Sequence, residues 1–81
     1  MALKGKSMSH DYRTTEDLMR IAAAGGGFTI NGGPRTIEDL MKIAAAAGSK
    51  GARVTFTGMN FRTTEELMRI AAAGKGCIEF A

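Results

Sequence analysis

The 81-residue sequence has few of the residues that build catalytic, covalent or metal sites. It contains one cysteine, Cys77, one histidine, His10, and no tryptophan. A single thiol excludes a disulfide within the chain, and a chain without a disulfide framework is typical of the cytoplasm. One imidazole and one thiol also fall short of the usual zinc ligand sets and of a nucleophile with an oriented base. The sequence therefore predicts no catalytic residue, no metal ligand and no cofactor.

Long hydrophobic segments are missing as well. The longest run of hydrophobic residues covers residues 43–47, whereas a membrane-spanning helix needs roughly 20 such residues. Residues 1–10 include Lys4 and Lys6 but no apolar stretch behind them, so they do not resemble a secretory signal. We expect a cytoplasmic protein with no membrane partner.

Aromatic side chains are scarce, with four phenylalanines and one tyrosine. Hydrophobic residues make up 44% of the chain. Many of them are alanine, which buries little surface, or methionine, which packs adaptably. The length suits one domain over residues 1–81, and its core is expected to be thin. Self-association is one way in which a small protein enlarges such a core.

What the sequence does contain is a threefold internal repeat. The copies read RTTEDLMRIAAA at 13–24, RTIEDLMKIAAA at 35–46 and RTTEELMRIAAA at 62–73. A glycine-bearing break and a short alternating segment follow each copy. Such similarity indicates recent duplication or an engineered repeat. It divides the chain into an irregular or briefly extended segment at 1–12 and three units at 13–31, 35–60 and 62–81.

The first half of each unit is predicted to be an α-helix. In the first copy, Leu18, Ile21 and Ala22 fall at i, i+3 and i+4, which places them on one helix face. Each copy has a threonine three residues before an acidic residue, a pattern typical of a capped helix start. The pair Thr63 and Glu66 matches a full capping box. The glycines expected to end the helices are Gly25, Gly48 and Gly74.

The second half of each unit alternates between apolar and polar residues, which predicts a β-strand with one buried face. The polar side of these strands consists of Thr29, Asn31, Thr55, Thr57 and Glu79. Because helices separate the strands, the pairing is expected to be parallel with right-handed crossovers. The sequence therefore predicts a two-layer α/β fold of three tandem helix–strand repeats, with a small mostly parallel sheet and the helices on one face.

This architecture leaves surfaces for a partner. A three-stranded sheet has two open edges, and exposed edges pair with other chains unless they are guarded. The last strand has only Glu79 as a guard. We expect a homo-oligomer, most simply a two-fold dimer, with another protein as a further candidate partner. The five polar strand residues are the candidate interaction residues.

Basic residues recur in register and form a candidate basic ladder of Arg13, Arg20, Arg35, Lys42, Arg62 and Arg69. The two basic residues of each unit are seven positions apart, which predicts that they lie on one helix face. A row of such residues can bind the phosphates of a nucleic acid. A glutamate stands four residues before the second basic residue of each unit, which favours ion pairs along the helix instead. We expect the self-paired face, and nucleic acid is the less favoured partner.

Two other features have simpler interpretations. Residues 31–36 lead from a strand into a helix, where anion-binding loops lie. They match no nucleotide fingerprint, and a turn stiffened by Pro34 is the favoured interpretation. The glycines at 25–27 and 74–76 follow helix C-termini, where the field disfavours anions. Cys77 is predicted to open the third strand on its polar side, with no base at hand.

Taken together, these patterns favour a non-enzymatic structural or protein-interaction repeat module that self-associates. Met19, Met41 and Met68 border the apolar helix stripes, either as core edge or as an adaptable protein-binding surface. A small basic nucleic-acid-binding protein is the alternative hypothesis. A third hypothesis is an enzyme or small-ligand site at residues 31–36.

Overall fold

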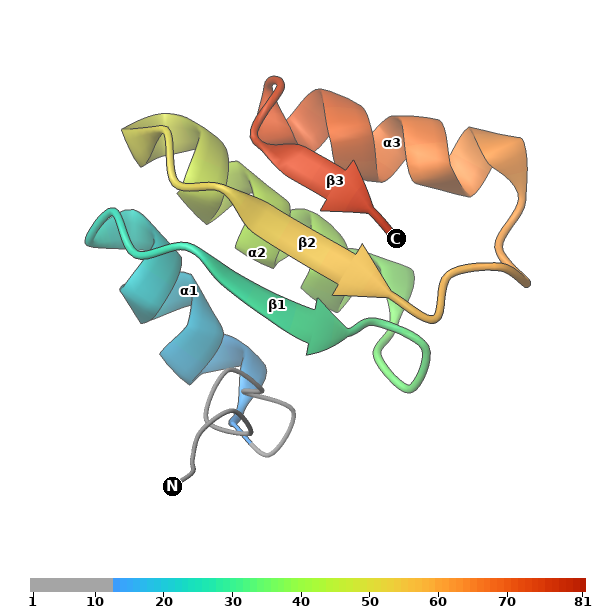
Figure 1. The fold of residues 1–81 in the computed structure, drawn as a ribbon, viewed down its shortest axis with the longest axis horizontal. Coiled ribbons are helices and arrows are strands. Elements are labelled where there is room, and N and C mark those ends of the chain that lie inside the picture. The colour runs from blue at the N-terminus through green and yellow to red at the C-terminus, as the bar shows by residue number, and fades with distance from the viewer. Residues whose placement is uncertain (1–12) are drawn as a thin grey trace.

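In the computed structural model, which describes residues 13–81, helices and strands alternate along the chain. The elements are α1 (Thr15–Ala23), β1 (Phe28–Asn31), α2 (Ile37–Lys50), β2 (Val54–Thr57), α3 (Thr64–Gly74) and β3 (Ile78–Phe80). The strands form one parallel sheet in the order β1-β2-β3 (Figure 1). The predicted α/β fold is therefore confirmed. The segment at residues 1–12, which includes His10, lies outside the described residues.

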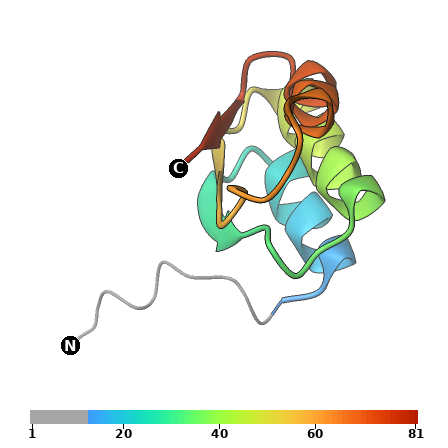
Figure 2. The ribbon, with the colours of Figure 1, turned by 90° about the vertical axis from the view of Figure 1, so that its right-hand side faces the viewer.

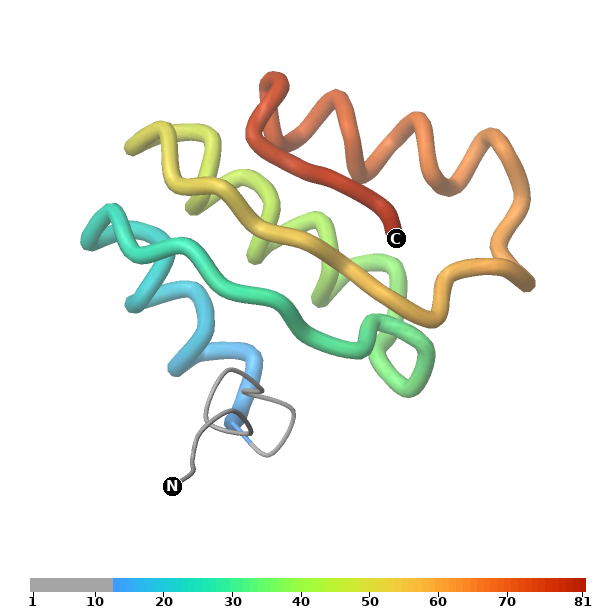
Figure 3. Tube along the Cα trace, viewed as in Figure 1, coloured from blue at the N-terminus to red at the C-terminus, as the bar shows by residue number. Residues whose placement is uncertain are grey.

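The molecule has two layers, with the sheet on one side and the three helices on the other (Figure 2). Each connection between neighbouring strands runs through a helix behind the sheet and is right-handed, as the path in Figure 3 shows. The helices lie side by side in chain order, and α2 contacts both α1 and α3. None of the helices among residues 13–81 is long and apolar enough to cross a membrane.

The helices begin where the threonine pattern predicts. The hydroxyl oxygens of Thr14, Thr36 and Thr63 accept hydrogen bonds from the backbone amides three residues later, at 3.1–3.2 Å. Such bonds satisfy amides that the first helical turn leaves without a partner. At α3 the Glu66 carboxylate also accepts a hydrogen bond from the Thr63 amide at 3.1 Å, which completes the expected capping box.

The strand alternation separates a buried side from an open side. In β1 and β2 the apolar residues are buried, and their polar neighbours are exposed or partly exposed. The core lies between the layers, and its largest fully buried side chains are Phe56, Leu18, Ile30, Leu40, Ile43, Ile70 and Val54. Four of these seven belong to the second unit, because it has a neighbour on each side.

Two of the three predicted helix-ending glycines are placed differently by the structure. Gly25 follows α1 with a φ of +95°, as expected. Gly48 instead lies inside α2, which continues to Lys50 and ends at Gly51 with a φ of +73°. Gly74 is the last residue of α3, and the left-handed position is taken by Lys75. The prediction for Gly48 and Gly74 was therefore wrong.

The reason is close packing around both glycines, of Gly48 against α3 and of Gly74 against β3. A methyl group added to Gly48 would lie 2.8 Å from the carbonyl oxygen of Gly74 and 3.2 Å from that of Ala73. A methyl group added to Gly74 would collide with Cγ1 of Ile78. Both glycines are thus required by packing rather than by a left-handed backbone, and packing of this kind is not visible in a local sequence pattern.

The substitution Gly48→Ala tests this packing role. Helix propensity alone would stabilise the protein by about 1 kcal/mol. The contact with backbone atoms of α3 should instead lower the free energy of unfolding by about 1–3 kcal/mol, measured by urea denaturation. The matched control is Ala45→Gly on the exposed side of α2, which reports the propensity term. A more stable Gly48→Ala variant would contradict the close approach.

Candidate interaction surface

The five polar strand residues gather on the face of the sheet that carries no helix. Strand register places Thr29 beside Thr55, and Thr55 beside Glu79, in one row across the sheet. Asn31 and Thr57 are neighbours in the next row. We call this the open sheet face, made of Thr29, Asn31, Thr55, Thr57 and Glu79 together with Arg53. It is turned away from α1, α2 and α3 (Figure 2).

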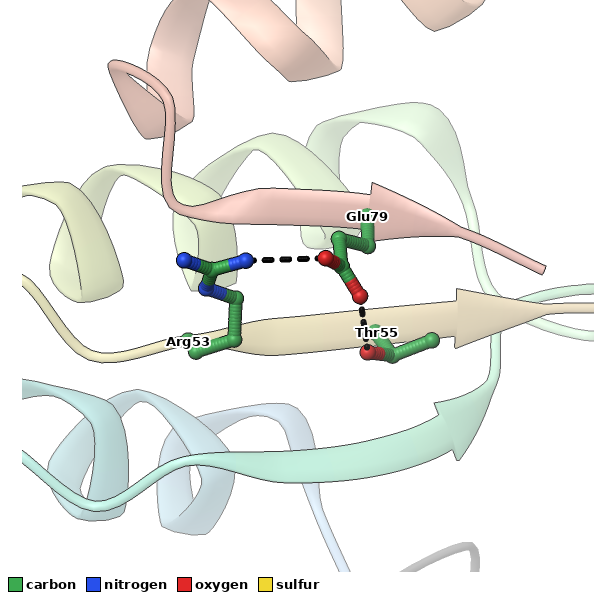
Figure 4. Close-up of polar contacts among 3 residues, drawn as sticks. All are labelled: Arg53, Thr55 and Glu79. Carbon is green, nitrogen blue, oxygen red and sulfur yellow. Dashed lines mark hydrogen bonds and ion pairs between the residues drawn. The ribbon is translucent and has the colours of Figure 1, made fainter.

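Arg53 is the member of this face that sequence reasoning missed. Its guanidinium Nη1 lies 2.8 Å from Oε2 of Glu79, and the Thr55 hydroxyl lies 3.5 Å from Oε1 of the same carboxylate (Figure 4). Both side chains of the ion pair are more than half exposed, at 65% and 57%, so the pair stabilises the fold by at most about 1 kcal/mol. Arg53 lies two positions before Thr55, so continuing the alternation past the start of β2 would have placed it on the same face.

The two residues at the far end of the open sheet face bond to the backbone. The Thr57 hydroxyl donates to the carbonyl oxygen of Ile30 at 3.3 Å. Oδ1 of Asn31 accepts a hydrogen bond from the Gly33 amide at 2.9 Å. These bonds orient both side chains toward the backbone.

The candidate basic ladder splits into two rows. Arg20, Lys42 and Arg69 lie within the helices and are exposed in every unit; we call them the outer basic row. Arg13, Arg35 and Arg62 are half-buried and precede the N-cap threonines; we call them the inner arginine row. The seven-residue spacing therefore does not bring both basic residues of a unit onto one helix face, because the first of them is not helical.

The inner arginine row connects successive units. Arg35 donates from Nη2 to the carbonyl oxygen of Arg13 at 2.8 Å and from Nη1 to the Thr15 hydroxyl at 3.2 Å. Arg62 repeats this arrangement one unit later, because its Nη2 donates to the carbonyl oxygen of Arg35. Each of these guanidinium groups thus reaches from its own unit to the equivalent backbone carbonyl of the unit before.

Arg62 makes the more extensive connection. Its Nη2 also lies 3.3 Å from the carbonyl oxygen of Gly32 and 3.4 Å from that of Gly33. The Phe61 ring lies 4.6 Å from the Arg62 Cζ atom, a distance typical of a cation–π contact. The planar guanidinium suits this arrangement, because it presents several donors at fixed angles.

The expected ion pairs along the helices are absent from residues 13–81. Glu16 forms no ion pair with Arg20, and neither do the corresponding glutamates and basic residues of α2 and α3. The one ion pair within this range is Arg53–Glu79. The outer basic row therefore keeps its charge facing solvent. Pairs of this kind contribute only a few tenths of a kcal/mol, so their absence costs the helices little.

The backbone amides of the loop at residues 31–36 donate hydrogen bonds to other groups of the protein. Gly32 donates to the carbonyl oxygen of Thr57 at 2.8 Å, and Arg35 donates to that of Gly32 at 3.2 Å. Gly33 donates to Asn31, and Pro34 has no amide hydrogen. An anion loop needs amides that point at a ligand, and these are already bonded within the protein. This geometry favours the turn interpretation.

The prediction that Cys77 opens the third strand on its polar side is wrong. Cys77 precedes β3 by one residue, is half-buried and packs against the core. Its amide donates to the carbonyl oxygen of Gly74 at 3.0 Å, and its carbonyl oxygen accepts from Val54. The turn after α3 thus sets its orientation. Within residues 13–81 there is no group of three or more His, Cys, Asp or Glu side chains that could hold a metal ion.

Comparisons with protein families, with curated proteins and with solved structures found no match to this chain.

The substitution Arg62→Lys tests the bridging role of the inner arginine row. A lysine keeps the charge but cannot present the planar set of donors, so we expect the free energy of unfolding to fall by about 1–2 kcal/mol. Urea denaturation measures it. The matched control, Arg69→Lys in the outer basic row, should change stability by less than about 0.5 kcal/mol. Equal effects of the two substitutions would argue against the bridge.

Proposed function

We propose that the chain is a non-enzymatic protein-interaction repeat module that associates with copies of itself. The observation that carries this proposal is the uncovered sheet. Parallel sheets usually have both faces covered, yet none of the described helices lies over the open sheet face (Figure 2). Within residues 13–81, the outer edge of β3 is also unpaired. Exposed edges of this kind favour pairing with another chain.

The distribution of exposed apolar side chains supports the same proposal. Phe61 and Met68 are 66% and 63% exposed. Phe61 directly precedes the third unit, and Met68 lies within it. The third unit also has the least buried strand, because Ile78 and Phe80 are only half-buried. Association at this end would remove apolar surface from water, which is the main favourable term in most protein association.

Size-exclusion chromatography with light scattering tests self-association. We expect a mean mass above the 8.5 kDa of one chain that rises with concentration through the low micromolar range, because the contact is between separate copies. A mass that stays at that of one chain over the whole range would contradict the proposal.

The outer basic row supports a second candidate function, the binding of nucleic acid. Its three side chains are exposed on neighbouring parallel helices and are not neutralised by ion pairs within residues 13–81. The described inner-row residues Arg35 and Arg62 bond to backbone oxygens instead. Three phosphate contacts would be few, and binding that depends on them would weaken steeply with salt.

Titration of a generic DNA duplex separates the two functions. For a protein-interaction module we expect no binding even at about 50 mM salt, where phosphate contacts are strongest. If the outer basic row did bind duplex through three phosphates, the logarithm of the affinity would fall with the logarithm of salt with a slope of about −2.7. Arg69→Ala would then reduce that slope by about one third. Binding with this behaviour would favour the second candidate.

A further inference from the structure

The three units have nearly the same sequence but differ in burial, and the differences show which side of each unit meets a neighbour. The apolar positions Leu18, Leu40 and Leu67 are equivalent, and the first two are fully buried whereas Leu67 is only half-buried. The side chain is the same in all three, so the difference comes from the neighbouring unit. Leu18 and Leu40 are followed by another unit, and α3 is the last helix of the chain described.

Two further positions behave like the leucines. Met19 and Met41 are half-buried and pack against the core, whereas Met68 is 63% exposed. Ala22 and Ala44 are buried, whereas Ala71 is half-buried. We call the side of a unit that these positions form its forward face; in the third unit it consists of Leu67, Met68 and Ala71.

A second set of positions shows the opposite trend, because it meets the unit before. Ile43 and Ile70 are buried whereas Ile21 is half-buried, and Ala46 and Ala73 are half-buried whereas Ala24 is exposed. We call this side the rear face; in the first unit it consists of Ile21, Ala24 and the exposed Asp17, which corresponds to the half-buried Asp39 and Glu66.

Contacts within the chain confirm that forward and rear faces meet. Met19 of α1 lines a shallow groove together with Ala46 of α2. One unit further on, Gly48 of α2 approaches the backbone of Ala73 and Gly74 in α3. The two contacts differ in detail, because Gly48 lies outside the positions of the forward face, but in each of them the forward side of one helix meets the rear side of the next.

We propose that the forward face of the third unit binds the rear face of the first unit of a second copy, head to tail. This inference rests on the proposed self-association and specifies its geometry. The leucine, methionine and alanine of the forward face are identical in all three units, and so are the isoleucine and alanine of the rear face. The two free faces therefore carry the same leucine, methionine, isoleucine and alanine residues that face a neighbouring unit within the chain.

The strand edges agree with this arrangement. Phe28 pairs with Val54, and Val54 pairs with Ile78, in parallel and in constant register. A head-to-tail contact places the first unit of the second copy after the third unit, in the same direction in which the units follow one another within the chain. A two-fold dimer through β3 would need an antiparallel strand pair and would place two forward faces against each other. Neither arrangement has a precedent within the chain.

The experiment uses two exposed positions, one on each free face, and follows assembly by sedimentation velocity. Met68→Glu places a charge in the forward face of the third unit, and Ala24→Glu places one in the rear face of the first. The control is Ala45→Glu, since the equivalent alanines are exposed in all three units. A charge buried without a partner should weaken the contact about 100-fold or more, so each of the two variants should remain monomeric where the unmodified chain assembles. Circular dichroism checks that each variant is folded.

Mixing the two folded variants decides the geometry. The Ala24→Glu chain retains an intact forward face and the Met68→Glu chain an intact rear face, so a head-to-tail contact gives a one-to-one complex that grows no further. If the unmodified chain assembles but the mixture stays monomeric, the head-to-tail arrangement is overturned while self-association stands. A two-fold dimer would show itself by assembly of Ala24→Glu alone. If the unmodified chain is monomeric throughout, self-association itself fails.

Discussion

The structure depends on lateral burial between units, because a single helix–strand unit cannot bury its own apolar side. The second unit shows this most clearly. Its Leu40, Ile43, Val54 and Phe56 are fully buried. The units on both sides cover them, and so does the opposite layer of their own unit. The equivalent residues at the outer side of the third unit are partly exposed. Stability in such repeat arrays is close to a sum of unit terms and nearest-neighbour terms, so the two internal contacts contribute directly to the stability of the chain.

Polar side chains reinforce the same lateral contacts. Arg35 and Arg62 each bond to a carbonyl oxygen of the preceding unit, which ties together loop segments that contribute little apolar surface. On the other side of the sheet, Arg53 and Glu79 join β2 to β3. The guanidinium bonds are partly buried, whereas the ion pair is exposed and screened by solvent, so the arginine bridges contribute more to stability.

The sequence was sufficient to predict the elements, the caps at the helix N-termini and the two layers, because these follow from local periodicity. The period of 3.6 residues, the threonine caps and the alternation at residues 28–31 and 54–57 are all properties of short segments. The wrong predictions concerned packing between elements. Gly48 resembles a helix end in a linear sequence, yet the approach of α3 explains why it is glycine. The Arg35 and Arg62 bridges were missed for the same reason. Arginines that recur at equivalent positions look like exposed surface residues in the sequence, and only the structure shows their carbonyl acceptors in the preceding unit.

The two internal contacts are not equivalent, and this bears on how a further unit would fit. The glycine contact between α2 and α3 depends on the extra length of α2, which has 14 residues against 9 in α1 and 11 in α3. The position in α3 that corresponds to Gly48 is Lys75, which lies after the helix in a left-handed conformation. The forward face of the third unit therefore resembles that of the first unit, where the corresponding Gly26 also follows the helix. The contact between α1 and α2, which is made by helix positions before the C-terminal turn, is accordingly the appropriate template for any unit placed next to α3. A contact of this kind joins different faces of identical copies, so it either closes into a ring or continues as a filament, and the twist of the sheet from one unit to the next determines which.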